Sequence, residues 1–195
     1  MTIQTRRERE RAERERMIVT AARELAEAEG WDAVTTRRLA EEIEYSQPVL
    51  YSHFKGKGAI MAAVAVQGCA ELAVELRAAR TAAAGAREAL AAVARAYTAF
   101  ARRRPALYDV IFTLDVDLPF ATPEAPAALQ DAFGELSQAV RPIAAEGEDT
   151  GALTETYWAG LHGLVTLMRS GRLPEEAHEL RLALFIGHFA PQGTA

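Results

Sequence analysis

Several features that would place a protein in other classes are scarce or absent in this sequence. The 195 residues include one cysteine, Cys69, which excludes an internal disulfide and suits a reducing cytoplasm. No uncharged apolar run reaches the roughly 18 residues of a membrane span, and the charged amino terminus lacks the apolar core of a signal peptide. We therefore expect a cytoplasmic protein with no membrane partner.

Signatures of catalysis and of metal binding are also missing. The four histidines are scattered, and the two that share a segment, His178 and His188, do not have the i,i+4 spacing of a zinc-binding pair. Gly56 and Gly58 lack the rest of any nucleotide-binding fingerprint. Cys69 lies in an alanine-rich segment, where a packing role is expected. We therefore expect no enzyme activity, no cofactor and no metal.

Strand-like alternation of apolar and polar residues is absent as well. Half of the residues are apolar, enough for a core, and proline and glycine fall between segments of helical periodicity. The fold class predicted is all-α.

Residues 35–54, with the sequence TTRRLAEEIEYSQPVLYSHF, predict two short helices joined by a tight turn. Either Thr35 or Thr36 can cap the first helix, because a threonine hydroxyl accepts a hydrogen bond from a free amide of the first turn. Leu39, Ala40 and Ile43 fall on one face of this helix. This pattern is typical of a helix-turn-helix, which places its second helix in the DNA major groove.

The second helix of the pair is expected to begin after Ser46, its predicted cap. Pro48 lies in the first turn, where its missing amide hydrogen costs nothing. Val49 and Leu50 are expected to point inward. Four residues are left for the outer surface: Gln47, Pro48, Tyr51 and His53.

This stretch and its flanks resemble the DNA-binding domain of the tetracycline-repressor (TetR) family. The similarity includes an apolar first-helix stripe, a Gly30-Trp31 ending with glycine suited to positive φ, and a Tyr-x-His-Phe-x-x-Lys run at residues 51–57. The chain departs from the family at Glu44, where glycine is usual, and at Gly58, where an acidic residue is usual. Glu44 therefore predicts a strained or differently shaped turn, and its effect on DNA docking stays open.

The resemblance implies a set of DNA-contacting residues whose roles follow from their chemistry. Phenol, imidazole, ammonium and hydroxyl groups donate to phosphate, whereas a Gln amide can pair with adenine and apolar groups can touch a thymine methyl. Alternatively, Tyr51 packs between helices and His53 is a structural hydrogen-bonding group. The candidates are Thr36, Tyr51, His53 and Lys57 for phosphate, Gln47, Pro48 and Val49 for bases, Arg38 for either, and Ser46 at the helix start.

The amino-terminal run of alternating Arg and Glu has two interpretations. It is either a solvated helical extension with i,i+4 pairs such as Glu10–Arg14 and Arg11–Glu15, or an arm whose first arginines, Arg6 and Arg7, reach DNA. The overall net charge is −5, with equal numbers of basic and acidic residues in residues 1–60. A DNA-binding surface would therefore require the basic residues to gather on one face.

The remainder of the chain predicts helices near residues 58–80, 86–103, 105–112, 126–146, 153–170 and 174–189. Trp158 to Gly163 resembles the Trp-x-x-x-His-Gly signature of one TetR-family carboxyl-terminal domain, which implies effector binding among the middle helices and dimerisation through the last two. We expect a DNA-binding domain at 1–57, with an arm at 1–15, and an effector-binding and dimerisation domain at 58–195. The apolar last two helices also favour a partner subunit.

The residues assigned to these roles are aromatic or apolar, and ordinary core packing is the alternative for each. The effector candidates are Tyr97, Phe100, Tyr108, Phe112, Tyr157 and His162. The dimer candidates are Trp158, Leu161, Val165, Met168, Leu182 and Phe185.

The function predicted is that of a homodimeric transcriptional regulator, a repressor that a small-molecule effector releases from a pseudo-palindromic operator in double-stranded DNA. Two alternatives stay open at this point. One is a constitutive regulator or activator without an effector, and the other is a helical small-molecule carrier that has lost DNA binding.

Overall fold

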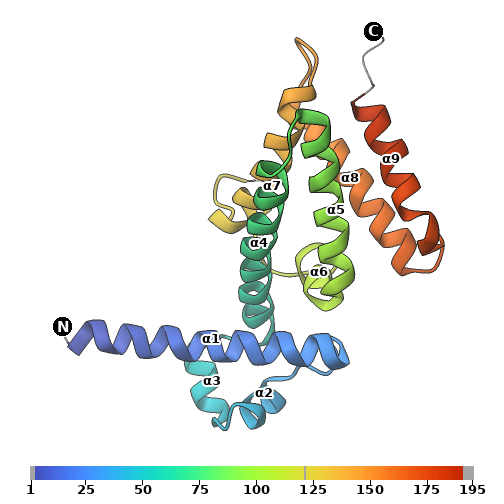
Figure 1. Ribbon diagram of the computed structural model, residues 1–195. Helices are drawn as coiled ribbons and strands as arrows, with labels where there is room; N and C mark the ends of the chain where they lie inside the picture. The colour runs from blue at the N-terminus through green and yellow to red at the C-terminus, as the bar shows by residue number, and fades with distance from the viewer. Residues whose placement is uncertain (1–2, 121, 191–195) are drawn as a thin grey trace. The chain divides into compact units, whose positions relative to one another are not determined.

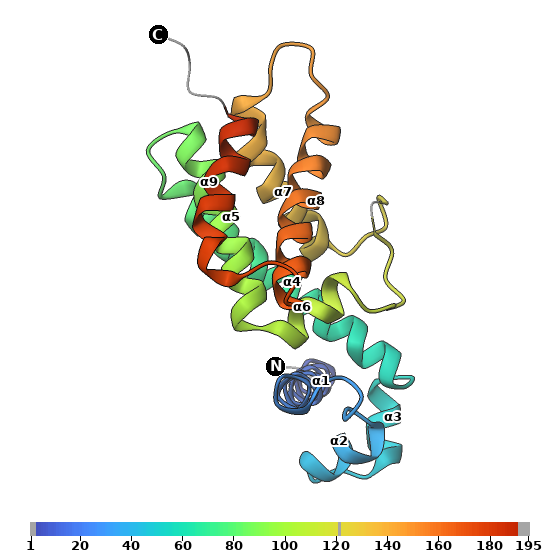
Figure 2. The ribbon, with the colours of Figure 1, turned by 90° about the vertical axis from the view of Figure 1, so that its right-hand side faces the viewer.

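The computed structural model describes residues 3–120 and 122–190, and all regular elements in these residues are helical (Figures 1 and 2). The all-α prediction is confirmed. In chain order the helices are α1 (Ile3–Glu29), α2 (Thr36–Glu42), α3 (Gln47–His53), α4 (Lys57–Thr81), α5 (Ala86–Arg103), α6 (Pro105–Phe112), α7 (Ala127–Val140), the 3₁₀ turn η1 (Arg141–Ile143), α8 (Thr150–Arg169), the 3₁₀ turn η2 (Glu175–Ala177) and α9 (His178–Phe189).

Two of the expected helices are shorter in the structure. The helix expected to end at residue 146 ends at Val140 and tightens into η1. Pro142 accounts for this, because it has no amide hydrogen and disfavours α-helical geometry in the preceding residue. The last helix starts at His178 rather than 174, after η2.

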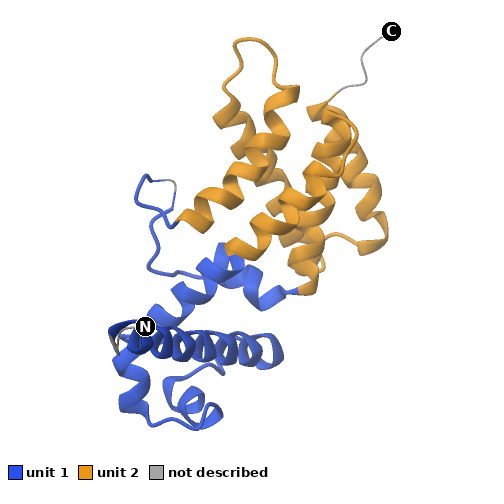
Figure 3. Cartoon of the chain, turned by 60° about the vertical axis from the view of Figure 1, so that its left-hand side comes forward, with its two compact units in different colours: residues 1–68, 104–126 blue, residues 69–103, 127–195 orange. Residues whose placement is uncertain are grey.

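The chain divides into two compact units, and the division falls within α4 (Figure 3). Unit 1 contains residues 1–68 and 104–126, and unit 2 contains residues 69–103 and 127–195. Unit 1 therefore holds α1, α2, α3, α6 and the first half of α4. Unit 2 holds the second half of α4 with α5, α7, α8 and α9.

In unit 1, α1 packs against α2, α3 and α6. Ile18, Leu39 and Leu50 are fully buried and form the centre of the helix-turn-helix core. The carboxylate of Glu27 accepts hydrogen bonds from the amides of Ala106 and Leu107, at 3.1 and 2.9 Å. These bonds satisfy two free amides at the start of α6 and hold α6 on α1.

In unit 2, α5 packs against α7, α8 and α9. The Tyr157 hydroxyl of α8 is fully buried and donates to the Leu90 carbonyl of α5 at 2.7 Å. Gly160 gives α9 a close approach to α8, because a Cβ there would lie 2.4 Å from ring atoms of Phe185. The second half of α4 contributes Cys69, where burial raises the pKa of the thiol to about 12 and favours the expected packing role.

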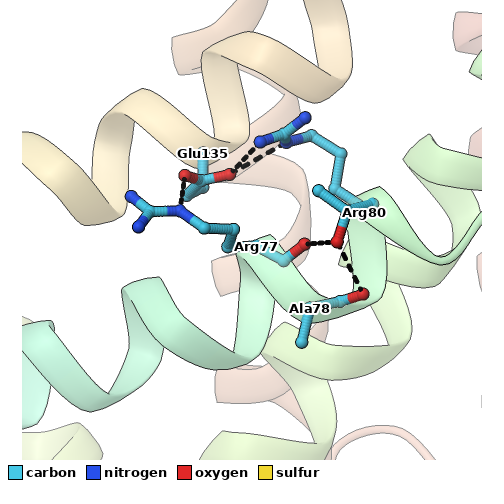
Figure 4. A network of polar contacts seen from close by, with 5 residues as sticks. Arg77, Ala78, Arg80 and Glu135 are labelled. Atoms are coloured by element: carbon cyan, nitrogen blue, oxygen red, sulfur yellow. Dashed lines mark hydrogen bonds and ion pairs between the residues drawn. The ribbon is translucent and has the colours of Figure 1, made fainter.

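A buried carboxylate joins α4 to α7 within unit 2 (Figure 4). Glu135 of α7 is 1% exposed, and its two oxygens accept hydrogen bonds from Arg77 at 2.7 Å and from Arg80 at 2.8 Å. Burial alone would raise the pKa of the Glu135 carboxyl, but hydrogen bonds from the two guanidinium groups outweigh it and lower that pKa. Glu135 is therefore ionised at neutral pH.

α4 is long and apolar enough to meet the length and composition of a membrane span, with a mean hydropathy of 1.6 in its most apolar window. Half of that window is buried inside the protein. The core helix of a soluble protein has the same composition, because neighbouring helices cover its apolar side chains.

Candidate nucleic-acid interface

The expected helix-turn-helix is formed by α2, the turn at residues 43–46 and α3. Thr35 is the cap of α2, and its hydroxyl accepts a hydrogen bond from the Arg38 amide at 3.2 Å. Ser46 occupies the cap position of α3, but its side chain makes no capping hydrogen bond. Pro48 lies in the first turn of α3, as the sequence predicted.

Glu44 gives the turn its shape. Its φ is +56°, the one positive φ outside glycine among the described residues. The Tyr45 amide donates to the Ala40 carbonyl at 2.8 Å and the Glu44 amide to the Glu41 carbonyl at 3.2 Å. These two bonds form a Schellman motif, in which glycine normally takes the left-handed position. Glu44 is therefore strained, as expected from the departure at this position.

The outer face of α3 is formed by five exposed residues: Gln47, Pro48, Val49, Tyr51 and Ser52. Val49 is 38% exposed, so the expectation that it points inward is wrong, whereas Leu50 is fully buried. Neighbouring residues of a helix point in directions about 100° apart. When Leu50 points into the core of the domain, Val49 therefore points toward solvent. Tyr51 is 51% exposed, and its hydroxyl lies 3.3 Å from the Thr36 hydroxyl of α2. The structure therefore brings these two phosphate candidates together.

Two other candidates are held by partners from α1 or the residues that follow it. Arg38 binds both carboxylate oxygens of Glu29, and this hydrogen bonding lowers the pKa of the Glu29 carboxyl. Lys57 donates to the Trp31 carbonyl at 2.5 Å. Contact with phosphate by either cation therefore requires it to exchange its present acceptor. Sequence reasoning missed these acceptors, since no regular spacing links them to the cations.

His53 is not on the outer surface, which corrects the sequence expectation. Its side chain is 6% exposed, and Nδ1 lies 3.5 Å from a Glu15 carboxylate oxygen of α1. The extension of α1 past the end of α3 covers this histidine. The alternative interpretation, a structural hydrogen-bonding group, describes its position.

The amino-terminal run is the first part of α1, which is helical from Ile3. Arg6 pairs with Glu10 at 2.8 Å and Arg11 with Glu15 at 2.9 Å. The second pair was expected, whereas Glu10 pairs with Arg6 rather than with Arg14. The run is therefore helical, and contact of its first arginines with DNA stays a prediction. Residues 1–2 of the expected arm lie outside the described part of the chain.

The six effector candidates are divided between the two units. Tyr108 and Phe112 belong to unit 1, and the other four belong to unit 2. Two of the buried phenols already have hydrogen-bonding partners, because Trp158 Nε1 donates to the Tyr97 hydroxyl at 3.0 Å and the Tyr157 hydroxyl donates to Leu90. His162 is half-buried, and burial lowers the pKa of its imidazole. Phe100 is fully buried.

Half of the dimer candidates belong to the core of the subunit. Leu161, Val165 and Leu182 are at most 3% exposed within one chain, so their assignment to a dimer surface is wrong. They face other helices of unit 2. Trp158, Met168 and Phe185 are half-buried. The large apolar residues left exposed on α8 and α9 are Leu167, Leu180 and Leu184, at 40%, 63% and 57%.

Comparison with known proteins identifies the family. Residues 18–64 match the model of bacterial regulatory proteins of the tetR family, and residues 90–185 match that of the tetracyclin repressor-like carboxyl-terminal domain. The chain belongs to the TetR family. It is a transcriptional regulator with an amino-terminal helix-turn-helix DNA-binding domain, as the sequence predicted. The match does not test the Trp-x-x-x-His-Gly signature, which stays a prediction.

Individual relatives agree with this assignment. An uncharacterized HTH-type transcriptional regulator of Mycobacterium tuberculosis is 28% identical over 155 residues, which are 79% of this chain and 69% of that protein. A protein of unknown function from Rhodococcus sp. RHA1 has a similar fold, with a TM-score of 0.76, 24% identity and coverage of 90% and 92% of the two chains. BioQ, solved with its double-stranded DNA operator, has a TM-score of 0.67 at 23% identity, with 91% and 98% covered.

Proposed function

We propose that this TetR-family regulator is a homodimeric repressor that binds a pseudo-palindromic operator through α2 and α3 and leaves it when a small-molecule effector binds. The outer face of α3 carries the proposal. Gln47, Pro48, Val49 and Tyr51 are all exposed there on a rigid helix whose Leu50 anchors it to the core. Such a face fits the DNA major groove. BioQ, which has a similar fold, was solved with operator DNA.

Within this face, the residues divide by chemistry. Gln47 at the start of α3 reads a base, because its amide can donate and accept hydrogen bonds at once. Pro48 and Val49 beside it offer apolar contact to a thymine methyl. Tyr51 and Thr36, whose hydroxyls are 3.3 Å apart, hold one phosphate between α2 and α3. Arg38 adds a phosphate contact after leaving Glu29.

Dimerisation rests on the exposed apolar side chains of α8 and α9. Leu180 and Leu184 are one turn apart on α9 and are the two most exposed leucines of the described residues. Leu167, which is also exposed, lies near the end of α8. A second copy would cover them, since large exposed apolar groups mark association surfaces. A two-fold dimer presents two α3 helices about 34–36 Å apart, which predicts a pseudo-palindromic site.

The effector would bind in unit 2, where α5 and α8 carry Tyr97, Phe100, Tyr157 and His162. The Trp158–Tyr97 hydrogen bond joins these helices and is a contact that a polar effector group could replace. The expected ligand is an apolar molecule with one or two polar groups. Tyr108 and Phe112 belong to unit 1, and the site proposed for unit 2 does not use them.

Selection of binding sites from a random duplex pool at near-physiological salt tests the proposal. We expect enrichment of a two-fold symmetric site, and Gln47→Ala should relax preference at one base position of each half-site. Tyr51→Phe is the matched variant for phosphate holding and should weaken binding to all sequences alike. An asymmetric site, or no enrichment at all, would contradict the dimeric operator-binding model.

The effector part of the proposal has its own measurement. Small molecules that shift the thermal unfolding of the chain would be added to the complex with the selected duplex, and affinity for the duplex would be measured. If none of the stabilising molecules changes the affinity for the duplex, release by an effector is contradicted. Operator binding itself is not affected by that result.

A further inference from the structure

The first four turns of α1 extend beyond the core of the helix-turn-helix. Ile18 is the first buried residue among residues 4–29 of α1, and residues 4–17 are exposed or half-buried. The family match also begins at residue 18. The preceding turns therefore lie outside the matched part of the DNA-binding domain.

The arginines of this extension occupy two opposite faces. A helix turns by about 100° per residue, so Arg7 and Arg14 lie within about 40° of the direction of buried Ile18. Arg9 and Arg16, with the same spacing of seven residues, lie about 160–180° away from Ile18. Arg7 and Arg14 thus prolong the face of α1 that is buried further along the helix.

That face is turned toward α2 and α3. Glu27, which holds the start of α6, lies about 180° from Ile18 around α1, so α6 occupies the opposite side. Glu15, about 60° from Ile18, contacts His53 at the end of α3. Arg7 and Arg14 therefore lie on the side of α1 that carries the recognition helix, beyond its end.

The arginines of this extension also differ in whether they form ion pairs with glutamates of α1. Arg6, Arg11 and Arg16 each have a glutamate of α1 within ion-pair distance. Arg7 and Arg14 are exposed and form no ion pair with any residue of the described segments, 3–120 and 122–190. A guanidinium without a carboxylate partner can bind phosphate without first breaking an internal pair.

We infer that Arg7 and Arg14 form a second DNA-contacting surface, which holds phosphates of the duplex that flanks the site read by α3. The inference rests on the proposed operator binding and adds a contact that the helix-turn-helix does not supply. The two side chains are about 10 Å apart along the helix, a span of about three base-pair rises. This contact is sequence-independent, because phosphates carry no base identity.

The test compares two variants of the full chain with equal charge change and equal spacing, Arg7→Gln/Arg14→Gln and Arg9→Gln/Arg16→Gln. Affinity is measured against salt concentration with two labelled duplexes, the one enriched in the selection and an unrelated one. Circular dichroism of each variant checks that α1 keeps its helix content.

Two phosphate contacts per chain are four in the proposed dimer and correspond to a change of about 3.6 in the slope of log affinity against log salt. We expect R7Q/R14Q to lose this slope on both duplexes, so that its deficit relative to the parent is on the order of 100-fold larger at 50 than at 200 mM salt. R9Q/R16Q should keep a slope close to that of the parent.

Equal slopes for the two variants, or a parent-like slope for R7Q/R14Q, would overturn the inference while operator binding by the parent stands. A parent chain that shows no salt-dependent affinity for either duplex would overturn both the inference and the proposed function.

Discussion

Glu29 in unit 1 and Glu135 in unit 2 are both glutamates bound by arginine, but they differ in exposure. The side chains of Glu29 and Arg38 are 47% and 40% exposed. Glu135 is 1% exposed and has two arginine partners, Arg77 and Arg80. Exposed pairs contribute little to stability, whereas breaking a buried pair leaves an uncompensated charge.

The difference shows how the same chemistry serves two purposes in one chain. In unit 1, the proposed phosphate contact of Arg38 would require only an exposed ion pair to be broken. In unit 2, Glu135 fastens α7 to α4 and cannot be exchanged without loss of stability. Substitutions in unit 2 should therefore mainly lower the free energy of unfolding, whereas removal of Glu29 in unit 1 should mainly change DNA affinity.

The largest effect is expected for Glu135→Gln. The amide keeps the shape but loses the charge that compensates Arg77 and Arg80, so the free energy of unfolding should fall by about 3 kcal/mol. Urea denaturation followed by circular dichroism measures it. Asp131→Asn on the same helix is the control and should change stability by less than about 0.5 kcal/mol. A similar loss in both variants would contradict a structural role for the buried carboxylate.

Gly160→Ala should destabilise unit 2 by about 2 kcal/mol, because the new methyl group would overlap the Phe185 ring and force α8 and α9 apart. Gly134→Ala is the matched change in α7, where a Cβ meets no atom within 4 Å. Better helix propensity should make that variant more stable than the parent, by up to about 1 kcal/mol. Thermal unfolding of the two variants should therefore shift in opposite directions.

Glu44→Gly should stabilise unit 1 by up to about 1 kcal/mol, since glycine adopts the left-handed conformation without a Cβ clash. Part of the gain is offset by the greater freedom of glycine in the unfolded chain. Glu42→Gly, at the end of α2 with helical geometry, should instead be destabilising. If both substitutions lower the unfolding temperature, Glu44 is not strained by its backbone conformation.

His178 should make unit 2 sensitive to acid. His178 Nε2 and the Thr98 hydroxyl form a buried hydrogen bond of 3.0 Å. Burial lowers the pKa of the His178 imidazole below its ordinary value of 6.5, and the folded state therefore binds its proton less readily than the unfolded state.

The resulting stability is complete above pH 6.5 and is lost as the pH falls through the lower pKa of the folded state. Urea denaturation at about pH 7.5 and about pH 5.5 should show a smaller acid-induced loss for His178→Gln than for the parent. Burial also lowers the pKa of His162, so His162→Gln is measured in parallel to separate the two contributions. An unchanged loss in His178→Gln would contradict this assignment.

The smallest effect on stability, no measurable change in the free energy of unfolding, is expected for Glu29→Gln, because the Arg38 pair is exposed. The variant should nevertheless bind DNA with a slope of log affinity against log salt steeper by up to about 1.8, since Arg38 is released for one phosphate in each chain of the proposed dimer. Glu24→Gln removes the same charge from the exposed surface of α1. A slope change of equal size there would show a general charge effect instead.

Local patterns in the sequence predicted much of the helix-turn-helix. Gly30 has the expected positive φ of 84°, Thr35 caps α2, and Leu39 and Leu50 are buried. These features depend on neighbours within about one helical turn, so periodicity and capping preferences suffice to find them. The strain at Glu44 was visible for the same reason.

The errors arose where a distant segment covers a side chain. The side chain of His53 is 6% exposed, and its partner Glu15 lies 38 residues earlier in the sequence. Leu161 and Leu182 face neighbouring helices of unit 2 rather than a second subunit. Apolar periodicity states which side of a helix is apolar, but not whether its own chain or a partner covers that side.

By itself, the sequence determined the helical class, the helix-turn-helix and the family, because these depend on spacing and local backbone preference along the chain. Tertiary structure decided which cationic side chains have an acceptor from another segment and which have none. Arg38 and Lys57 are held by acceptors that other segments supply, whereas Arg7 and Arg14 extend past the core without a carboxylate partner in the described chain. Ion pairing depends on distances of a few ångströms between segments, and these distances exist only after the helices have packed.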